Sequence, residues 1–540
     1  MTEVTSAPAG REVRWGVALA VLVAGMFMSI LDVTIVNVAI PTIQNDFGTT
    51  VEDVQWVANA YTLALGVVVP VSAWLGDRFG LGRVYVLSVL GFAAGSALCG
   101  VAWDLTSLVV FRIVQAIPGG IIPVITLAMI YKIVPKEKIG TAMGMYGLGI
   151  VFAPAVGPTL GGYLVEYVDW RLIFFINVPI GVLGAIAAVL TLPRFAPGRA
   201  GRFDLMGFLA VASGLFALLL ALSEGESWGW TSYPVVMLLL YAATSLAVFV
   251  VIELAVEHPL LDVRVFRHWQ FTNSLVLICL MSVALFAGLF YVSLLLQQAQ
   301  GLGAFETGLV MLPQALATGF VMPIAGRLYD RLGPRLPAVV GLAIVAVGTY
   351  LMTDLTVDTP REHIMWLLVL RGIGMGLAMM PIMTGGLAVI PPHQVAGAGA
   401  INNVVQRTAA ALGVAVLTAM LTSTQAQTMA DRAALLPSAG VVPPVGSPDV
   451  PPLLGSYAWY QQVNLQVYVV ALNDVFLVTA VISVLGVLGA LLLRRTPTPT
   501  AGPVPPAEPA PDVAIPAPRQ SPEAGPSARR PAAVGAPRRA

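Results

Sequence analysis

Two stretches of sequence set the architecture: AWLGDRFGLGR at residues 73–83 and GRLYDRLGPR at residues 326–335. Both carry the pattern L-x-D-R-x-G in a short polar segment between long apolar runs. In each half of the chain the next apolar run but one contains an arginine, within LVVFRIVQAIPGG (residues 108–120) and LLVLRGIGMGLAM (residues 367–379). The chain is therefore predicted to be an internal duplication. Repeats of this kind are typical of transporters that bind a substrate between two halves.

The composition places the chain in a membrane. Of its 540 residues, 57% are hydrophobic and 10% are charged, against roughly 25% charge in soluble proteins. Apolar runs of about 20 residues, the length that crosses a bilayer, recur along the chain. The first run is too long for a signal peptide and lacks a small-residue cleavage site, so we expect it to remain as a span. The two cysteines, Cys99 and Cys279, lie far apart in apolar runs and predict neither a disulfide nor a metal site.

Fourteen membrane spans are predicted, with ends defined to within several residues. They cover residues 15–38, 54–73, 84–102, 106–130, 141–165, 172–192, 205–223, 234–254, 271–296, 306–326, 337–354, 364–388, 397–421 and 472–493. Spans 1–6 match spans 9–14 in the duplication, and spans 7 and 8 are inserted between the halves. The predicted fold class is all-α, with two pseudo-symmetric six-helix bundles and two inserted helices.

Lysine and arginine set the expected orientation, because cytoplasmic loops of membrane proteins are enriched in these residues. With the N-terminus placed in the cytoplasm, nearly all basic loop residues fall on the cytoplasmic side. The opposite side holds only Arg171, Arg361 and Arg432. We therefore expect a multi-pass protein of the cell membrane with both termini in the cytoplasm.

The predicted organisation has five parts. They are a cytoplasmic N-terminus at residues 1–14, a six-helix bundle at 15–192, the two inserted helices with their linkers at 193–270, a second six-helix bundle at 271–495 and a tail at 496–540. The second bundle includes a long external loop at about residues 423–470. The tail is rich in proline and alanine, and we expect it to be a disordered cytoplasmic segment.

Charged residues inside spans are the first candidates for function, because an ionised Asp at the bilayer centre costs about 2.5–3.5 kcal/mol. Asp32 lies in the apolar stretch MSILDVTIVNVAIP (residues 28–41), and Arg112, Arg371 and Arg407 lie in later spans. Desolvation favours the protonated form of a carboxyl group, so Asp32 is a candidate proton carrier with Arg112 as its electrostatic partner. A structural Asp that bonds to local neighbours is the alternative. Arg371 and Arg407 are candidate cavity charges, for which packing and function are equally open.

In these features the chain resembles the major facilitator superfamily, and in particular its fourteen-span drug:proton antiporters of the EmrB/QacA type. The resemblance covers about residues 12–495 and is carried by five segments that follow one another in the family's order. They are LDVTIVNVAIP (31–41), LGDRFGLGR (75–83), RIVQAIPGG (112–120), GLGIVFAPAVGPTLGG (147–162) and WRLIFFINVPIG (170–181). Ala73, Leu81 and Gly82 depart from the loop pattern, which usually has glycine and arginine at these places.

The resemblance implies roles for further residues. It implies that Asp32 takes part in coupling, and that the loop motifs form a charge relay that locks the outward-facing state. The gating residues are then Asp77, Arg78, Gly80, Arg83, Asp330, Arg331 and Gly333. The two glycines of this set also permit a tight turn between helices. An antiporter motif that marks exporters comprises Gly157, Pro158, Gly161 and Gly162.

The predicted function is efflux driven by the proton motive force: a drug:H+ antiporter that exports amphipathic, neutral or monocationic compounds by alternating access. One acid and up to three bases at membrane depth argue against divalent cations as substrates. The sequence contains no G-x-x-x-x-G-K-[ST] loop, which argues against ATP as the energy source. An exporter of a lipid or an endogenous metabolite, with incidental drug efflux, is the alternative. A polytopic membrane enzyme is a remote alternative, because the four histidines are scattered over different loops.

The expected partners are small amphipathic substrates, protons and the lipid bilayer. No cofactor, metal or nucleic acid is expected. We expect the protein to function as a monomer, and a partner in the cell envelope remains open. The resemblance implies a bacterial cytoplasmic membrane and a contribution to antibiotic resistance.

Overall fold

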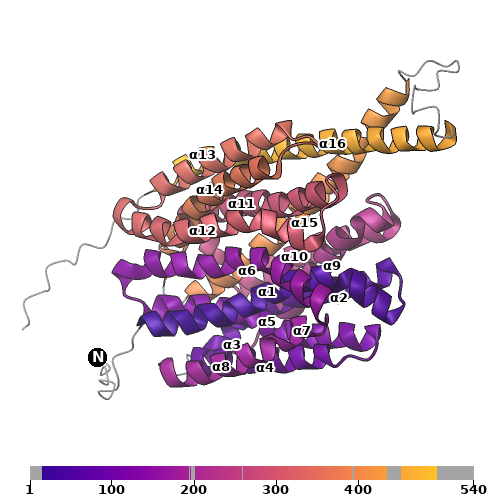
Figure 1. Ribbon diagram of the computed structural model, residues 1–540. Helices are drawn as coiled ribbons and strands as arrows, with labels where there is room; N and C mark the ends of the chain where they lie inside the picture. Colours follow the sequence, from indigo (N-terminus) through magenta and orange to yellow (C-terminus); the bar gives the residue numbers. More distant parts are fainter. Residues whose placement is uncertain are drawn as a thin grey trace, which may run out of the picture. The chain divides into compact units, whose positions relative to one another are not determined.

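The computed structural model describes residues 15–193, 195, 201–257, 259–391, 394–434 and 452–494. This part of the chain holds 14 helices that are long and apolar enough to cross a membrane, and its regular secondary structure is entirely helical (Figure 1). The predicted all-helical fold with fourteen spans is confirmed. The N-terminal segment 1–14 and the tail 496–540 lie outside the described residues.

The first half of the chain consists of eight α-helices that make six spans. They are α1 (Trp15–Phe47), α2 (Val51–Val68), α3 (Ser72–Phe79), α4 (Leu81–Gly100), α5 (Leu105–Ile133), α6 (Ile139–Tyr167), α7 (Leu172–Phe175) and α8 (Asn177–Thr191). Two short 3-10 turns, η1 (Val69–Val71) and η2 (Lys136–Lys138), precede α3 and α6. One span combines α2, η1 and α3, and another combines α7 and α8.

Two inserted helices and the second half follow. The inserted helices are α9 (Leu205–Trp228) and α10 (Tyr233–Ala255), and the 3-10 segment η3 (Val263–Arg267) leads into the second half. The second half comprises α11 (Trp269–Leu294) with a π-helical turn η4 (Leu295–Ala299), α12 (Ala304–Leu332), α13 (Arg335–Tyr350) with the 3-10 turn η5 (Leu351–Asp354), α14 (Arg361–Leu387), α15 (Val395–Ala434) and α16 (Pro452–Leu491).

Several helices are longer than the predicted spans. Helix α1 continues to Phe47, α15 continues to Ala434, and α16 begins at Pro452. The last two extend into residues 423–470, which we assigned to an external loop. Hydropathy marks only the apolar stretch that the bilayer requires, whereas a helix can continue beyond it with polar residues.

Local chemistry explains where helices begin and end. Gly80 and Gly333 end α3 and α12 with positive φ angles of 87° and 80°, a backbone conformation that glycine adopts at little cost. Asp104 caps the start of α5, where it accepts a hydrogen bond from the backbone N–H of Ser107 (2.7 Å). Bonds from Ser107 hold the pKa of the Asp104 carboxyl below its usual value.

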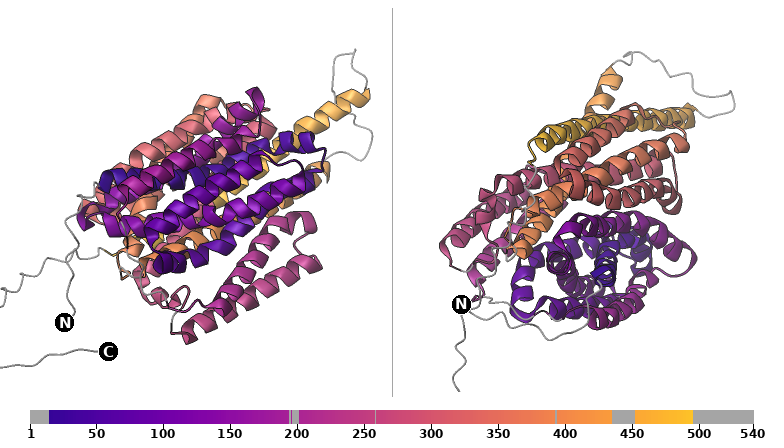
Figure 2. Two further views of the ribbon diagram at one scale, coloured as in Figure 1. Left: turned by 90° about the horizontal axis from the view of Figure 1, so that it is seen from below. Right: turned by 90° about the vertical axis from the view of Figure 1, so that its left-hand side faces the viewer.

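The two halves meet along α6 and α12, which pack extensively against each other. Small residues allow this close approach. A Cβ atom added to Gly144 of α6 would lie 2.6 Å from the carbonyl oxygen of Met322, and one added to Gly308 of α12 would lie 2.7 Å from the Thr159 hydroxyl. In the right-hand view of Figure 2 the indigo and purple helices of the first half and the orange helices of the second half form two groups.

Candidate functional site

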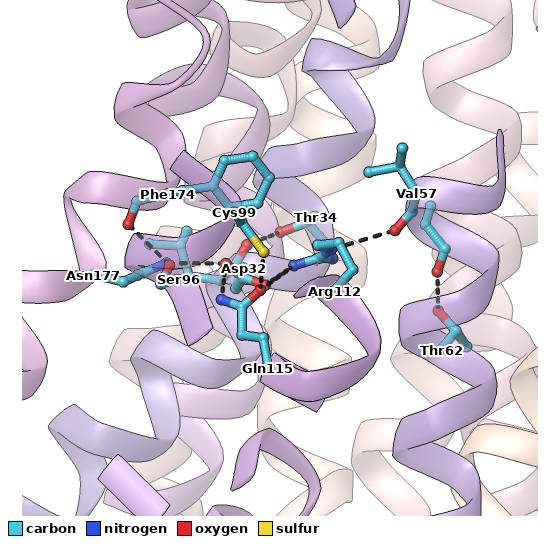
Figure 3. A network of polar contacts seen from close by, with 12 residues as sticks. Asp32, Thr34, Val57, Thr62, Ser96, Cys99, Arg112, Gln115, Phe174 and Asn177 are labelled. Carbon is cyan, nitrogen blue, oxygen red and sulfur yellow. Dashed lines mark hydrogen bonds and ion pairs between the residues drawn. The ribbon is translucent and has the colours of Figure 1, made fainter. Parts of the chain in front are cut away.

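The candidate coupling pair lies inside the first half. Asp32 on α1 has no solvent exposure, and Arg112 on α5 is 1% exposed. Arg112 Nη1 donates to Asp32 Oδ2 in an ion pair that joins the two helices (Figure 3). The structure therefore brings together the two charges that the sequence analysis paired.

The second oxygen of the Asp32 carboxylate is also fully engaged. Its Oδ1 accepts hydrogen bonds from Gln115 Nε2 (3.1 Å) on α5 and from Asn177 Nδ2 (2.9 Å) on α8. Asn177 Nδ2 also donates to Ser96 Oγ (3.1 Å), whose hydroxyl donates to the carbonyl oxygen of Phe174 (2.9 Å). Side chains from α5 and α8 thus donate to both oxygens of the carboxylate or to one of them, and they tie α1 to these two helices.

Arg112 has partners besides the carboxylate. Its Nη1 donates to Gln115 Oε1 (2.8 Å) and its Nε donates to the carbonyl oxygen of Val57 (3.3 Å). The guanidinium Cζ lies 3.7 Å from the centre of the Tyr61 ring, in a cation–π contact. Loss of the carboxylate charge thus leaves the guanidinium with a carbonyl, an amide oxygen and an aromatic face.

Sequence reasoning missed three members of this network. Gln115 follows Arg112 by three residues, which places both on one helix face, and this spacing is a signal that could have found it. Asn177 is a polar residue within the segment WRLIFFINVPIG, quoted above only as a family signature. Tyr61 carries no such signal. Thr34, a near neighbour of Asp32 in sequence, donates its hydroxyl to the carbonyl oxygen of Leu31 (3.1 Å) rather than to the carboxylate.

Arg371 lies on the helix of the second half that corresponds to α5, and it forms no ion pair with an acid among the described residues. It has no solvent exposure on α14, and its Nη2 donates to the carbonyl oxygen of Ala284 on α11 (2.6 Å). The neighbouring Leu285 is the repeat counterpart of Asp32. Gly288, one helix turn further on, leaves room for the guanidinium. Arg371 Nε and Nη1 have no hydrogen-bond partner among the described residues.

A small cavity of about 20 Å³ lies between the halves. Its lining comes from α6, α11, α14 and α15: Tyr146, Ile150, Ile278, Met281, Ser282, Leu285, Met379, Met383, Asn402, Asn403 and Gln406. This volume holds about one water molecule, so a substrate can enter only when the halves separate. None of these lining residues is charged. Arg407 lies on α15, partly buried, directly after Gln406. Neither Arg371 nor Arg407 forms an ion pair or a hydrogen bond with Asp32.

The loop motif of the second half holds the start of a first-half helix. Asp330 Oδ1 accepts a hydrogen bond from the backbone N–H of Gly140 (3.1 Å), and Asp330 Oδ2 accepts one from Thr141 Oγ1 (3.3 Å). Both donors lie in the first turn of α6, where the helix dipole also favours a negative charge. Arg331 follows in the last turn of α12, where it is exposed, and Gly333 ends that helix.

The loop motif of the first half faces a different element. Asp77 lines a polar cavity of about 260 Å³ together with Arg202, Asp262 and Gln394. Gln394 directly precedes α15 of the second half, and its Nε2 donates to Asp262 Oδ2 (3.0 Å). The arginines of this motif, Arg78 and Arg83, are exposed beside Gly80.

The antiporter motif is the contact surface of α6. Glycine at position 157 leaves room for the Thr34 side chain of α1, and a Cβ at Gly161 would lie 2.8 Å from Ile35 Cγ1. Gly162 faces Phe305 of α12 on the other side, where an added Cβ would make ordinary contacts of 3.4 Å. Pro158 lies inside the same helix. Helix α6 therefore links α1, which carries Asp32, to the second half.

Comparisons with known proteins agree with this architecture. The family model of the Major Facilitator Superfamily matches residues 22–414. The chain belongs to this superfamily of membrane transporters, and is a transporter rather than an enzyme. Among solved structures it is similar to the proton:xylose symporter XylE, with a TM-score of 0.56 at 11% identity over 88% of this chain and 94% of that one. This likeness shows the fold alone.

Its relatives in sequence include resistance proteins. The chain is 36% identical to the puromycin resistance protein pur8 of Streptomyces alboniger over 426 residues, which is 77% of this chain and 84% of that protein. It is 32% identical to the multidrug resistance protein B homolog of Mycobacterium tuberculosis over 431 residues, covering 78% and 79% of the two chains. The protein is thus a multi-pass membrane transporter related to drug-resistance exporters.

Proposed function

We propose that this protein is a drug:H+ antiporter that exports amphipathic, neutral or monocationic compounds. The observation that carries the proposal is the fully buried pair of Asp32 and Arg112. A carboxyl group that binds and releases a proton at membrane depth can couple transport to the proton gradient. A membrane potential of about 100 mV supplies roughly 2.3 kcal/mol for each charge moved.

Protonation of Asp32 changes the forces between three helices. The neutral acid no longer attracts Arg112 on α5, and it accepts weaker hydrogen bonds from Gln115 and Asn177 because bonds to charged groups are the stronger ones. Arg112 keeps its contacts with Val57 and Tyr61. Protonation of Asp32 therefore weakens the contacts of α1 with α5 and α8, while the Arg112 guanidinium keeps other partners.

The close packing of α1 on α6 can transmit this change to the cavity. Gly157 and Gly161 contact α1 within three residues of Asp32, and Tyr146 and Ile150 of the same α6 line the cavity between the halves. A shift of α1 toward or away from α5 must therefore move α6, because the two helices are close-packed and their interface has no free space.

The cavity lining fits the proposed substrate class. Its three methionines and one leucine supply adaptable apolar contacts, and Asn402, Asn403 and Gln406 supply amide donors and acceptors. Substrates with an apolar body and a few polar groups suit such a surface. The puromycin resistance and multidrug resistance for which the relatives are named are consistent with adaptable contacts.

The gate in this proposal consists of the two loop motifs. The hydrogen bond between Asp330 and the first turn of α6 is one contact between the halves. At the second place, Asp77 of α3 and Gln394, which precedes α15, line the same cavity. We place these loops in the cytoplasm from the distribution of basic residues, with the protein in a bacterial cytoplasmic membrane and acting as a monomer. Release of both contacts would open the cavity toward that side.

Proton release on substrate binding tests the proposal directly. Purified protein in weakly buffered detergent is mixed with the monocation tetraphenylphosphonium, and a pH-indicator dye records released protons. About one proton per bound cation is expected, and none from Asp32→Asn. Asp46→Asn, which removes an acid that is 43% exposed, is the matched control and keeps the release. Equal release from Asp32→Asn and the wild type would overturn the proposal.

A further inference from the structure

The inserted helices leave a space beside the second half. Helix α9 packs on α2 and α15, and α10 packs mainly on α9 and η3. Between this pair and helices α11, α15 and α16 lies an open groove of about 670 Å³. Figure 2 shows the inserted pair, in magenta, set to one side of the other helices.

The groove is apolar over its whole length. Leu215 and Phe249 of the inserted pair form one wall, and Val283, Val405, Ala409 and Val478 of the second half form the other. Its lining follows α15 from Ile401 to Leu417, a rise of about 24 Å at roughly 1.5 Å per residue. All five lining helices are membrane spans, so the groove lies at the depth of the lipid chains.

One end of the groove carries a pair of arginines. Val263 and Phe266 of η3 line that end, and Arg264 and Arg267 of the same segment are exposed beside them. Glu253 fixes the preceding loop, because its Oε1 accepts hydrogen bonds from the backbone N–H groups of Leu260 and Leu261 (both 3.2 Å).

The acids of this segment point elsewhere. Glu257 and Asp262 both line the separate polar cavity that Asp77 shares. Asp262 Oδ2 accepts from Gln394, and its Oδ1 accepts from the backbone N–H of Arg264 (3.0 Å). The two arginines are thus exposed on the segment at one end of the groove, where Arg264 Nη2 donates to the carbonyl oxygen of Leu254 at the end of α10 (3.1 Å). The two acids line the separate cavity.

We propose that this groove binds an anionic phospholipid, with an acyl chain between the inserted pair and the second half and the phosphate beside Arg264 and Arg267. An acyl chain supplies apolar surface of the right length at this depth, and basic residues at a membrane surface attract anionic head groups. The bound lipid completes the packing between α9–α10 and α11, α15 and α16. This gives the two inserted helices a role that does not depend on proton coupling.

Lipid retention on the purified full-length protein tests the proposal. The protein is extracted in detergent, supplied with equal amounts of dioleoyl phosphatidylglycerol and dioleoyl phosphatidylcholine, and analysed by native mass spectrometry. The wild type is expected to retain phosphatidylglycerol preferentially. Ala409→Phe, which fills the groove, should lose that lipid, whereas Val481→Phe on the exposed face of α16 should keep it.

The head-group contact is tested separately. The double variant Arg264→Gln, Arg267→Gln should lower the preference for phosphatidylglycerol by about 25-fold, since each basic residue near a membrane surface contributes roughly a fivefold factor. Lys136→Gln with Lys138→Gln, an exposed basic pair on the 3-10 turn η2, is the matched control and should change nothing.

Three results would overturn the proposal. They are equal lipid retention by Ala409→Phe and Val481→Phe, an unchanged lipid preference in the arginine variant, and displacement of the lipid by tetraphenylphosphonium in proportion to its binding. The last result would make the groove a substrate site. A variant that fails to fold is recognised by its melting profile, and Val405→Phe then serves as the second groove-filling change.

Discussion

Replacing Arg112 with Gln should make the stability of this protein depend on pH in a defined direction. The change removes the cation from a pair in which both side chains are almost completely buried. Breaking a buried ion pair by removing one partner costs about 3–5 kcal/mol, because an uncompensated charge remains. Asp32 can escape that cost by taking up a proton, whereas Arg112 in the reverse variant Asp32→Asn cannot lose one.

The sign follows from proton binding. Without its cation, the folded protein binds a proton at Asp32 more readily than the unfolded chain does. The stability of Arg112→Gln should therefore be highest at low pH and should fall as the pH rises, by up to about 1.4 kcal/mol per pH unit. The Gln115 and Asn177 donors still favour the carboxylate, which keeps the total loss near 3 kcal/mol, the lower end of the range.

Unfolding of the purified protein in mixed micelles, followed by tryptophan fluorescence between about pH 5 and pH 8, measures this effect. The double variant Asp32→Asn, Arg112→Gln carries no charge at the pair and is the control for all other titrating groups. Asp32→Asn alone should be destabilised at every pH. Parallel pH profiles for Arg112→Gln and the double variant would refute the reasoning.

Three further changes test other parts of the structure. Asn177→Leu removes one hydrogen-bond donor to the Asp32 carboxylate, a bond worth about 1.5 kcal/mol. The midpoint of the pH–transport profile should therefore rise by roughly one pH unit. An unchanged midpoint would count against a positioning role for Asn177. Asp330→Ala should speed hydrogen exchange of the Gly140 amide by about tenfold, because it removes roughly 1.4 kcal/mol of hydrogen bonding. Unchanged exchange would show that the contact is not maintained in solution. Gly144→Val should abolish folding or transport, because the valine side chain would force α6 away from α12. Gly16→Val should be tolerated, because the space around Gly16 is open. Equal behaviour of the two variants would contradict the packing described for α6 and α12.

The spans were predictable because each depends on local composition. A run of about 20 apolar residues has few alternatives to a membrane helix, and the two L-x-D-R-x-G loops mark the duplication. Helix ends were less predictable: α15 and α16 run past the apolar stretch, where hydropathy carries no information. The division of the chain into bundles and the orientation in the membrane stay predictions.

The charged residues of the candidate site were predictable from the sequence, whereas its amide side chains were not. Asp32 and Arg112 are conspicuous because charge at membrane depth is costly. Gln115 and Asn177 cost less to bury and so stand out less, and only the three-dimensional arrangement shows that they complete the carboxylate's bonds. Arg371 and Arg407 were grouped with Arg112 on charge alone, and neither forms an ion pair with Asp32 in the structure.

The groove beside the inserted helices had no sequence signal at all. Its walls are ordinary apolar residues from five spans, and which faces remain uncovered depends on how the helices pack. Arg264 and Arg267 contributed to the orientation prediction as loop charges. That their segment lines one end of an apolar groove is information that only the fold supplies.

Transport in liposomes under an imposed pH gradient tests the central claim most directly. Wild type and Asp32→Asn are reconstituted side by side, and uptake of tetraphenylphosphonium is compared with its binding to each protein. We predict that the gradient drives transport in the wild type and that Asp32→Asn loses this transport while it still binds the cation. Equal gradient-driven transport by both proteins would contradict coupling through Asp32.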